Sequence, residues 1–411
     1  MTDVVIAGGG PAGATLALLL GRAGLTVEVY EAKTFPREKP CGEGIMPAGV
    51  AVLDRLGLRA AVGGRPLASV RYHGFGLSAE AGFPIGPKGT APFALAQRRL
   101  HLDQALLAAA RATPGVRVFD DARVEGAAVA GGRAIGLHVG GELRRAGVVV
   151  GADGLDSPVR RSLGLDRRGP PGEAGRVGVR MHNRLAAGQE EPSRLEIFIG
   201  RGYELYAAPL PYGELLLAAL GDRDAFGPNA RDAMARWIGE QPLLRDWLDG
   251  ATPLTKLAGR APVTRRARAG FAPGAVLLGD AARASDPLTA GGIAHALVTA
   301  ERLAAIVPRA LAEGDAALAR FDRERRRLLR AHDWLTRALV YLVDRPVLAR
   351  ATMRAMRAAP GLMRALLGIG GGVGIRPPDQ RRARVRAATS AALALPASKP
   401  TDQNATLSQR A

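Results

Sequence analysis

The sequence predicts an α/β protein: a mostly parallel sheet covered by helices, with a mainly antiparallel β layer inserted and further helices after it. Two uninterrupted apolar runs, Val4–Ile6 and Val148–Val150, indicate strands that are buried on both faces. Shorter alternating runs with aromatic residues and prolines, at 71–93 and 178–219, predict the antiparallel layer. From residue 300 to about 367 the sequence is dense in Ala, Leu and Arg, which predicts helices.

The composition limits the classes of protein that fit. The chain has 411 residues, 47% of them hydrophobic, so it can bury a large core in two or three domains of ~150 residues each. Its single cysteine excludes an internal disulfide and a multi-cysteine metal site, so we expect a reduced, cytoplasmic protein without a metal centre. The net charge is +19, but only 4% of residues are aromatic, so few side chains can stack on bases and we expect no nucleic-acid partner.

The first element is a βαβ unit with a glycine turn. We expect a strand at Asp3–Ala7, a turn at Gly8–Gly13, a helix at Ala14–Ala23 and a second strand at Thr26–Tyr30. The turn fits the pattern G-x-G-x-x-G, in which glycines allow a tight bend and backbone amides approach a pyrophosphate. Glu31 follows the second strand, where a carboxylate accepts hydrogen bonds from a ribose diol. The unit therefore predicts a dinucleotide site that includes Gly8, Gly10, Ala12, Gly13 and Glu31.

Two more glycine–acid corners follow apolar strands. Asp153 and Gly154 come after the strand that ends at Gly151, and Asp280 comes after the strand 275–278. Pro287 then precedes Gly291 and Gly292, which open an apolar helix. A carboxylate at a strand end can hold a ribityl hydroxyl, and a helix start offers N–H groups to the electron-rich edge of a flavin ring. A Gly-Asp pair alone is an ordinary turn.

With these three corners in this order, residues 1–375 resemble the single-component FAD-dependent monooxygenases of the para-hydroxybenzoate hydroxylase type. Their relatives, the geranylgeranyl reductases and flavin halogenases, share the pattern. The resemblance implies a Rossmann-like FAD-binding domain of the glutathione-reductase type, with NAD(P)H as co-substrate. It also implies that Arg99, or its rival Arg98, contacts the flavin and that Val124 packs its backbone against adenine. The loop 36–44 resembles one that brings Cys41 and Gly42 near the isoalloxazine ring.

The same patterns suggest domain boundaries. We expect a discontinuous FAD-binding domain at 1–70, 95–165 and 270–305, and a substrate-binding domain at 71–94 and 166–269. A helical region should follow at 306–375, and a flexible polar tail at 376–411.

The substrate-domain segments guide the choice of reaction. The W-x-W-x-I-P segment of the halogenases is absent, and residues 202–209 keep a Tyr and a Pro but lack the Trp-x-Phe of the prenyl reductases. The resemblance thus favours a monooxygenase, in which oxygen adds to the reduced flavin C4a and the hydroperoxide hydroxylates or epoxidises a hydrophobic aromatic, quinone-like, polyketide or isoprenoid molecule. The alternatives are a reductase of isoprenoid double bonds and a non-catalytic redox sensor. No catalytic base is assigned, because a His or Tyr on a strand, such as His73, His182, Tyr203 or Tyr206, is more often a packing residue.

The last helices carry arginines on one side. Arg350, Arg354, Arg357 and Arg364 fall on one helical face, although Pro360 should kink or end the helix. Either these helices pack over the substrate domain with a solvated arginine stripe, or the stripe makes peripheral contact with a membrane that delivers a lipophilic substrate.

Overall fold

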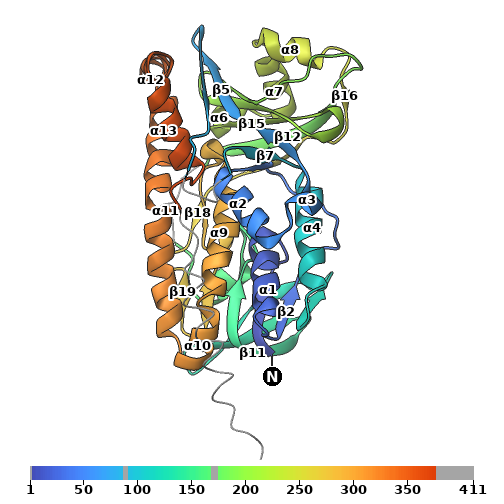
Figure 1. The fold of residues 1–411 in the computed structure, drawn as a ribbon, viewed down its shortest axis with the longest axis vertical. Coiled ribbons are helices and arrows are strands. Elements are labelled where there is room, and N and C mark those ends of the chain that lie inside the picture. Colours follow the sequence, from blue (N-terminus) through green and yellow to red (C-terminus); the bar gives the residue numbers. More distant parts are fainter. Residues whose placement is uncertain (1, 87–90, 168–174, 376–411) are drawn as a thin grey trace, which may run out of the picture. The chain divides into compact units, whose positions relative to one another are not determined.

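The structure is a computed structural model that describes residues 2–86, 91–167 and 175–375, all of which belong to one unit, residues 1–376 (Figure 1). The predicted tail, 376–411, lies outside the described residues. The described part has one sheet with a parallel centre, one mostly antiparallel sheet and a series of helices at its C-terminal side. The predicted α/β fold with an antiparallel insertion and C-terminal helices is confirmed.

The first sheet has a parallel centre in the order β8-β2-β1-β11-β20, with β19 at one edge and the β9–β10 hairpin extending from β11. Val4, Val5 and Ile6 are fully buried, as expected for a strand covered on both faces. The strands are β1 (Thr2–Ala7), β2 (Val27–Tyr30), β8 (Val116–Phe119), β9 (Val124–Ala130), β10 (Arg133–Val139), β11 (Glu142–Gly151), β19 (Phe271–Ala272) and β20 (Ala275–Leu277).

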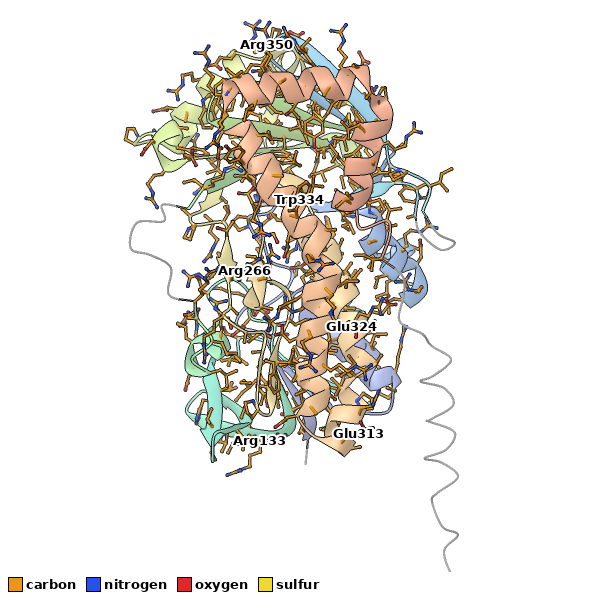
Figure 2. The ribbon with its side chains drawn as sticks, turned by 90° about the vertical axis from the view of Figure 1, so that its left-hand side faces the viewer. Arg133, Arg266, Glu313, Glu324, Trp334 and Arg350 are labelled. Carbon is orange, nitrogen blue, oxygen red and sulfur yellow. The ribbon has the colours of Figure 1, made fainter. Side chains whose placement is uncertain are left out.

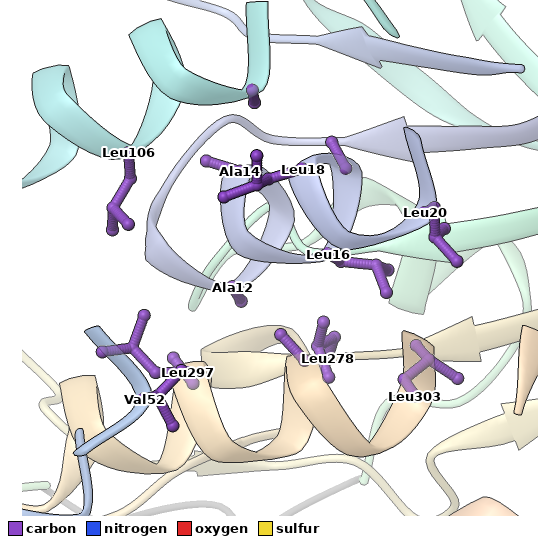
Figure 3. Close-up of a cluster of buried hydrophobic side chains, with 14 of the residues drawn as sticks. Ala12, Ala14, Leu16, Leu18, Leu20, Val52, Leu106, Leu278, Leu297 and Leu303 are labelled. Carbon is purple, nitrogen blue, oxygen red and sulfur yellow. The ribbon is translucent and has the colours of Figure 1, made fainter. Parts of the chain in front are cut away.

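Helices cover one face of this sheet, and their apolar side chains form its main core. Figure 3 shows leucines of α1 and α9 facing one another, with Val52 and Leu106 closing the cluster from two further helices. Helix α1 begins at Pro11, three residues earlier than predicted, because proline suits the first turn of a helix. The helices are α1 (Pro11–Arg22), α2 (Pro47–Leu56), α3 (Arg59–Val62), α4 (Arg99–Arg111), α9 (Gly292–Ala304) and α10 (Val307–Glu313); α5 (Pro158–Ser162) packs against β9.

The second sheet has the order β16-β12-β15-β14-β13-β5-β6, with β17 also paired to β12. Its pairs are antiparallel except β13 with β5, which is parallel. Three short helices cover one face, where Trp237 stacks on Tyr203. The strands are β5 (Ser69–Gly74), β6 (Leu77–Gly82), β12 (Val177–Arg184), β13 (Leu195–Ile199), β14 (Tyr203–Pro209), β15 (Glu214–Gly221), β16 (Thr252–Pro253) and β17 (Ala258–Arg260), and the helices are α6 (Arg223–Phe226), α7 (Ala230–Gly239) and α8 (Pro242–Leu248).

The C-terminal helices run along the first sheet and then over the second. Helix α11 (Ala316–Val343) lies beside α9, and α12 (Pro346–Ala358) and α13 (Pro360–Gly370) pack on β6 (Figure 1). The predicted interruption at Pro360 is confirmed, since α12 ends at Ala358 and α13 begins at Pro360. Within the described ranges, no helix combines the length and apolarity that a membrane crossing needs.

Short elements connect the two sheets. A three-stranded sheet joins β3 (Gly44–Ile45), β7 (Ala94–Ala96) and β4 (Arg65–Leu67), and a two-stranded ladder pairs β18 (Arg265–Arg266) with β21 (Arg283–Ala284). Three 3₁₀ turns complete the described elements: η1 (Pro211–Gly213), η2 (Gly279–Ala281) and η3 (Pro287–Thr289).

Candidate functional site

Strand register brings the three predicted corners together. Ala7 at the end of β1 pairs with Gly151 of β11, and Gly151 pairs with Leu277 of β20. The loops that follow these residues therefore leave the same carboxyl edge of the parallel sheet, which is where ligands bind in open α/β sheets.

The glycine turn is tightly packed. Gly8 has φ +95°, and a Cβ there would lie 2.5 Å from the carbonyl oxygen of Ala152, so the first corner touches the second. A Cβ on Gly13 would lie 2.0 Å from the carbonyl oxygen of Gly8, whereas one on Gly10 would meet only Arg37 Nη2, at 3.8 Å. Gly8 and Gly13 thus shape the turn, and Gly10 leaves open space above the start of α1.

Glu31 stands beside this turn. It is buried, its Oε2 accepts a hydrogen bond from Gly9 N at 2.8 Å, and its Oε1 accepts one from Lys33 N at 3.1 Å. Its backbone carbonyl accepts from Ala122 N at 2.8 Å, so the start of β9 runs next to it. Val124 is buried in the core behind this corner. Glu31 and the segment before Val124 therefore flank the turn where the ribose and adenine of a dinucleotide are predicted.

A cleft of about 1980 Å³, counted with its open mouth, lies over the sheet edge and reaches the second sheet. Ten of the predicted site residues line it: Gly10, Ala12, Cys41, Gly42, Arg99, Asp153, Gly154, Asp280, Pro287 and Gly292. The other five, Gly8, Gly13, Glu31, Val124 and Gly291, are not among its lining residues.

Two helices begin at this cleft without a side-chain cap. Gly10 precedes α1 and Gly291 precedes α9, and neither can accept a hydrogen bond from the first turn of its helix. Free N–H groups at a helix start bind anions and electron-rich groups. Asp280, between the two, is half exposed and lies 3.7 Å from Lys39 Nζ.

Asp153 has a buried oxygen without a partner. Its Oδ2 accepts a hydrogen bond from Val159 N at 3.1 Å, whereas Oδ1 is buried and has no protein partner among the described residues. Burial raises the pKa of this carboxyl, although Ser157 and backbone N–H groups oppose the shift. An orphaned acceptor beside two uncapped helix starts fits FAD, which brings hydroxyl donors, a pyrophosphate and an electron-rich ring edge.

Arg99 and Cys41 are neighbours in the cleft wall. Arg99 is buried, and its Nε and Nη2 each lie 2.7 Å from the carboxylate of Asp103. Burial acts to lower its pKa, but the charge of Asp103 and hydrogen bonding to Asp103 and Cys41 more than offset this and raise it. Arg98 instead pairs with Glu38 and Glu214. The structure thus places Arg99 in the cleft and Arg98 in the contacts between the loop 36–44 and the second sheet.

Glu43 and His182 form a buried pair that the sequence analysis did not predict. Glu43 Oε2 lies 2.8 Å from His182 Nε2, and its Oε1 accepts a hydrogen bond from Arg99 N at 3.0 Å. Glu43 has φ +57° and is 1% exposed. The one available signal was a charged residue between two glycines in the loop; its partner is 139 residues away in the sequence. The pair joins the loop 36–44 to the second sheet.

An apolar chamber adjoins the cleft. It lies between the second sheet and helices α11, α12 and α13; its space is about 910 Å³ when open solvent is counted, of which about 70 Å³ can hold the centre of a water molecule. No charged side chain is among its described lining residues. Five residues line both the chamber and the cleft: Met46, Phe83, Leu195, Tyr206 and Ala290. The two spaces therefore share a wall.

Tyr206 lies in that shared wall. Its hydroxyl is buried and has no partner among the described residues, and burial and the charge of Glu204 raise its pKa well above the usual value. Burial also raises the pKa of Glu204 to about 7, although its ion pair with Arg176 opposes this. Arg176 Nη1 lies 3.0 Å from Asp286 Oδ1, just before η3. An uncharged hydroxyl thus stands between cleft and chamber, with a buried polar network behind it.

Comparisons with known proteins agree with this geometry. The profile of the family described as "FAD binding domain" matches residues 1–335. Menaquinone reductase of Mycobacterium tuberculosis is 36% identical over 178 residues, 39% of this chain, and the match spans 40% of that relative. Menaquinone reductase of Mycolicibacterium smegmatis is 31% identical over 320 residues, 74% of this chain and 75% of the relative. The 6-methylpretetramide 4-monooxygenase of Streptomyces rimosus is 35% identical over 173 residues, 40% of this chain and 41% of the relative.

Solved structures share the fold. A flavin-dependent brominase superposes with a TM-score of 0.77 over 95% of this chain and 99% of its own, at 19% identity.

Proposed function

Because the chain belongs to the FAD binding domain family, we propose that it is an FAD-dependent reductase that takes electrons from NAD(P)H and saturates a carbon–carbon double bond of an isoprenoid lipid. The observation that carries this proposal is the uncharged chamber, which shares a wall with the cofactor cleft. Such a chamber suits a hydrocarbon chain, since burying each CH₂ contributes ~0.8 kcal/mol. Similarity over 75% of a menaquinone reductase supports a substrate of this kind.

The cleft residues would hold the cofactor. The N–H groups at the starts of α1 and α9 bind its anionic and electron-rich parts, and the orphaned Oδ1 of Asp153 accepts from a hydroxyl. The Arg99–Asp103 pair keeps the Cys41 loop in place. FAD, when bound and reduced, supplies the hydride that saturation of a double bond requires.

Reduction also requires a proton. Tyr206 Oη carries a proton at physiological pH and no described acceptor competes for it, although burial and the charge of Glu204 raise its pKa and so weaken it as an acid. At the wall between cleft and chamber this hydroxyl would donate its proton to a carbon of the reacting double bond. The apolar lining keeps water from competing.

The chamber also suggests how a lipid arrives. Met353, Met356 and Met363 line it from α12 and α13, whose outer arginines are exposed; Arg350 stands at the outer surface in Figure 2. These two helices can therefore lie on an anionic membrane surface while a lipid tail passes beneath them. Co-sedimentation with anionic vesicles at low salt tests this part of the proposal.

A monooxygenase of a hydrophobic molecule is the second candidate. The 6-methylpretetramide 4-monooxygenase relative favours it, and the same cleft and chamber could serve it. In that case the residues around Tyr206 would orient the substrate and exclude water, and oxygen would be a co-substrate.

Product mass separates the two candidates. Holoprotein, NADPH and an isoprenoid lipid without a quinone ring are incubated under nitrogen and in air. The proposal predicts a product heavier by two hydrogen atoms under both atmospheres. A product heavier by one oxygen atom, formed only in air, would instead establish the oxygenase. An unchanged lipid under both atmospheres would exclude this class of substrate.

A further inference from the structure

Arginines gather on the outer side of the β18–β21 ladder, away from the cleft. Arg266 of β18 pairs directly with Arg283 of β21, so two like charges face each other across the ladder. Cross-strand partners have Cβ atoms ~5 Å apart, and like charges at such positions repel. Ala284, the next residue of β21, lines the cleft, and neighbouring strand residues point to opposite faces. Arg283 therefore points away from the cofactor site.

Helix α11 adds three more arginines to the same place. Arg325 is buried on the packed face of α11, whereas Arg326 and Arg337 are exposed at its edge, and burial and the charges of all three lower the pKa of Arg266. Figure 2 shows Arg266 beside α11 at a height between Glu324 and Trp334. Asp322 pairs with Arg325, at 2.6 Å, and with Arg326. Asp333 pairs with Arg283 and lies 3.5 Å from Arg266 Nη2.

The charges in this cluster do not balance. Among the described residues, two carboxylates, Asp322 and Asp333, pair with four of the five arginines, and Arg337 donates only to the backbone carbonyl of Asp333. Arg325 is 7% exposed and its Nε has no partner there. Burial lowers the pKa of Arg283 to about 9, helped by Arg266, Arg325 and Arg337. Uncompensated guanidinium groups this close are what a phosphate group neutralises.

We propose that the arginine cluster, Arg266, Arg283, Arg325, Arg326 and Arg337, is a binding site for a phosphate monoester or diphosphate, separate from the FAD cleft. Several guanidinium forks can donate to the oxygens of one diphosphate, and the anion relieves the repulsion across the ladder. A soluble molecule or a lipid headgroup can carry this phosphate, and the chemistry of recognition is the same for both.

Calorimetric titration of FAD-loaded protein with inorganic pyrophosphate at low salt tests the site, because bound FAD fills the cofactor's own phosphate position. We expect saturable binding, at least about tenfold weaker in Arg266→Gln and in Arg337→Gln, two exposed positions where substitution spares the core. Arg350→Gln on α12 removes the same charge elsewhere and should bind as the wild type does. Absent binding, or equal weakening by all three variants, would overturn the proposal.

The melting temperature of Arg266→Gln, compared with that of the wild type, tests the proposal independently. Without pyrophosphate, Arg266→Gln should melt at a higher temperature than the wild type, because it removes a like charge opposite Arg283. With saturating pyrophosphate the order should reverse. A variant that melts lower than the wild type in both conditions would show that Arg266 is only a stabilising ion-pair residue. Repeating the titration with a soluble nucleoside diphosphate and with phosphatidic acid vesicles distinguishes the two sources of phosphate.

Discussion

The cofactor cleft and the apolar chamber are built in different ways. The cleft depends on backbone: strand ends in register, glycines that allow close approach, and two uncapped helix starts. The chamber depends on side chains that come from the second sheet and from three C-terminal helices. A site built from backbone tolerates few substitutions, but the same cofactor site can serve many reactions. A chamber built from side chains can be altered by substitution to fit a different substrate.

The largest effect on FAD affinity is expected from a substitution in the glycine turn, where backbone packing is tightest. In Gly13→Ala the new Cβ would lie 2.0 Å from the carbonyl oxygen of Gly8, so the turn must open. We expect FAD to bind at least about a hundredfold more weakly, about 3 kcal/mol. Fluorescence titration measures this. Gly239→Ala, where a Cβ meets nothing within 4 Å, is the control. Unchanged FAD affinity in Gly13→Ala would contradict the backbone account of the cleft.

A substitution in the wall that the cleft and the chamber share should lower turnover more than it weakens substrate or FAD binding. Tyr206→Phe removes the hydroxyl with no described partner, and we expect kcat to fall about a hundredfold with little change in KM or FAD affinity. Tyr72→Phe, in the same chamber but away from the cleft, should keep kcat. Steady-state kinetics with the reductase substrate measures both. Equal kcat values for the two variants would remove Tyr206 from the proton step.

A polar side chain introduced into the chamber should weaken substrate binding without weakening FAD binding. Met353→Gln places an amide in an apolar lining, and we expect KM for the lipid to rise about tenfold while FAD affinity stays the same. Met234→Gln makes the same change at a buried position on the other face of the second sheet. It should lower stability without raising KM. If Met353→Gln weakened FAD as strongly as the lipid, the two regions would not be separable.

The stability of the protein should depend on pH through a buried histidine of α11. His332 is buried. Its Nε2 shares a hydrogen bond with Thr289 Oγ1 at 2.9 Å, and its ring packs against that of His295. Burial and the charge of Arg283 lower its pKa to about 4. The unfolded chain takes up this proton below its ordinary pKa of ~6.5, so stability is complete above that pH and falls toward pH 4.

We expect a loss of about 3 kcal/mol over this range, measured by urea unfolding, and a shallower dependence in His332→Gln. His138→Gln, at an exposed position, should leave the dependence unchanged. A pH profile identical in wild type and His332→Gln would assign the dependence to other groups.

The sequence predicted the cleft better than the chamber for a physical reason. Gly8, Asp153 and Asp280 each follow an apolar strand, so local pattern alone placed them at one sheet edge. The Glu43–His182 pair and the shared wall at Tyr206 depend on contacts between distant segments, which no local pattern encodes. The sequence analysis predicted a mainly antiparallel layer but not the one parallel pair within it, β5 with β13, because their register is set across more than a hundred residues.

One anaerobic experiment tests the central claim, that the cleft and the chamber work as a unit. Holoprotein is freed of oxygen, reduced with one equivalent of NADPH and mixed with an isoprenoid lipid that lacks a quinone ring, while the visible absorbance of FAD is followed. The account predicts that the oxidised spectrum returns at the rate at which saturated lipid forms, and that Tyr206→Phe slows both together. A spectrum that stays reduced until air is admitted would contradict it.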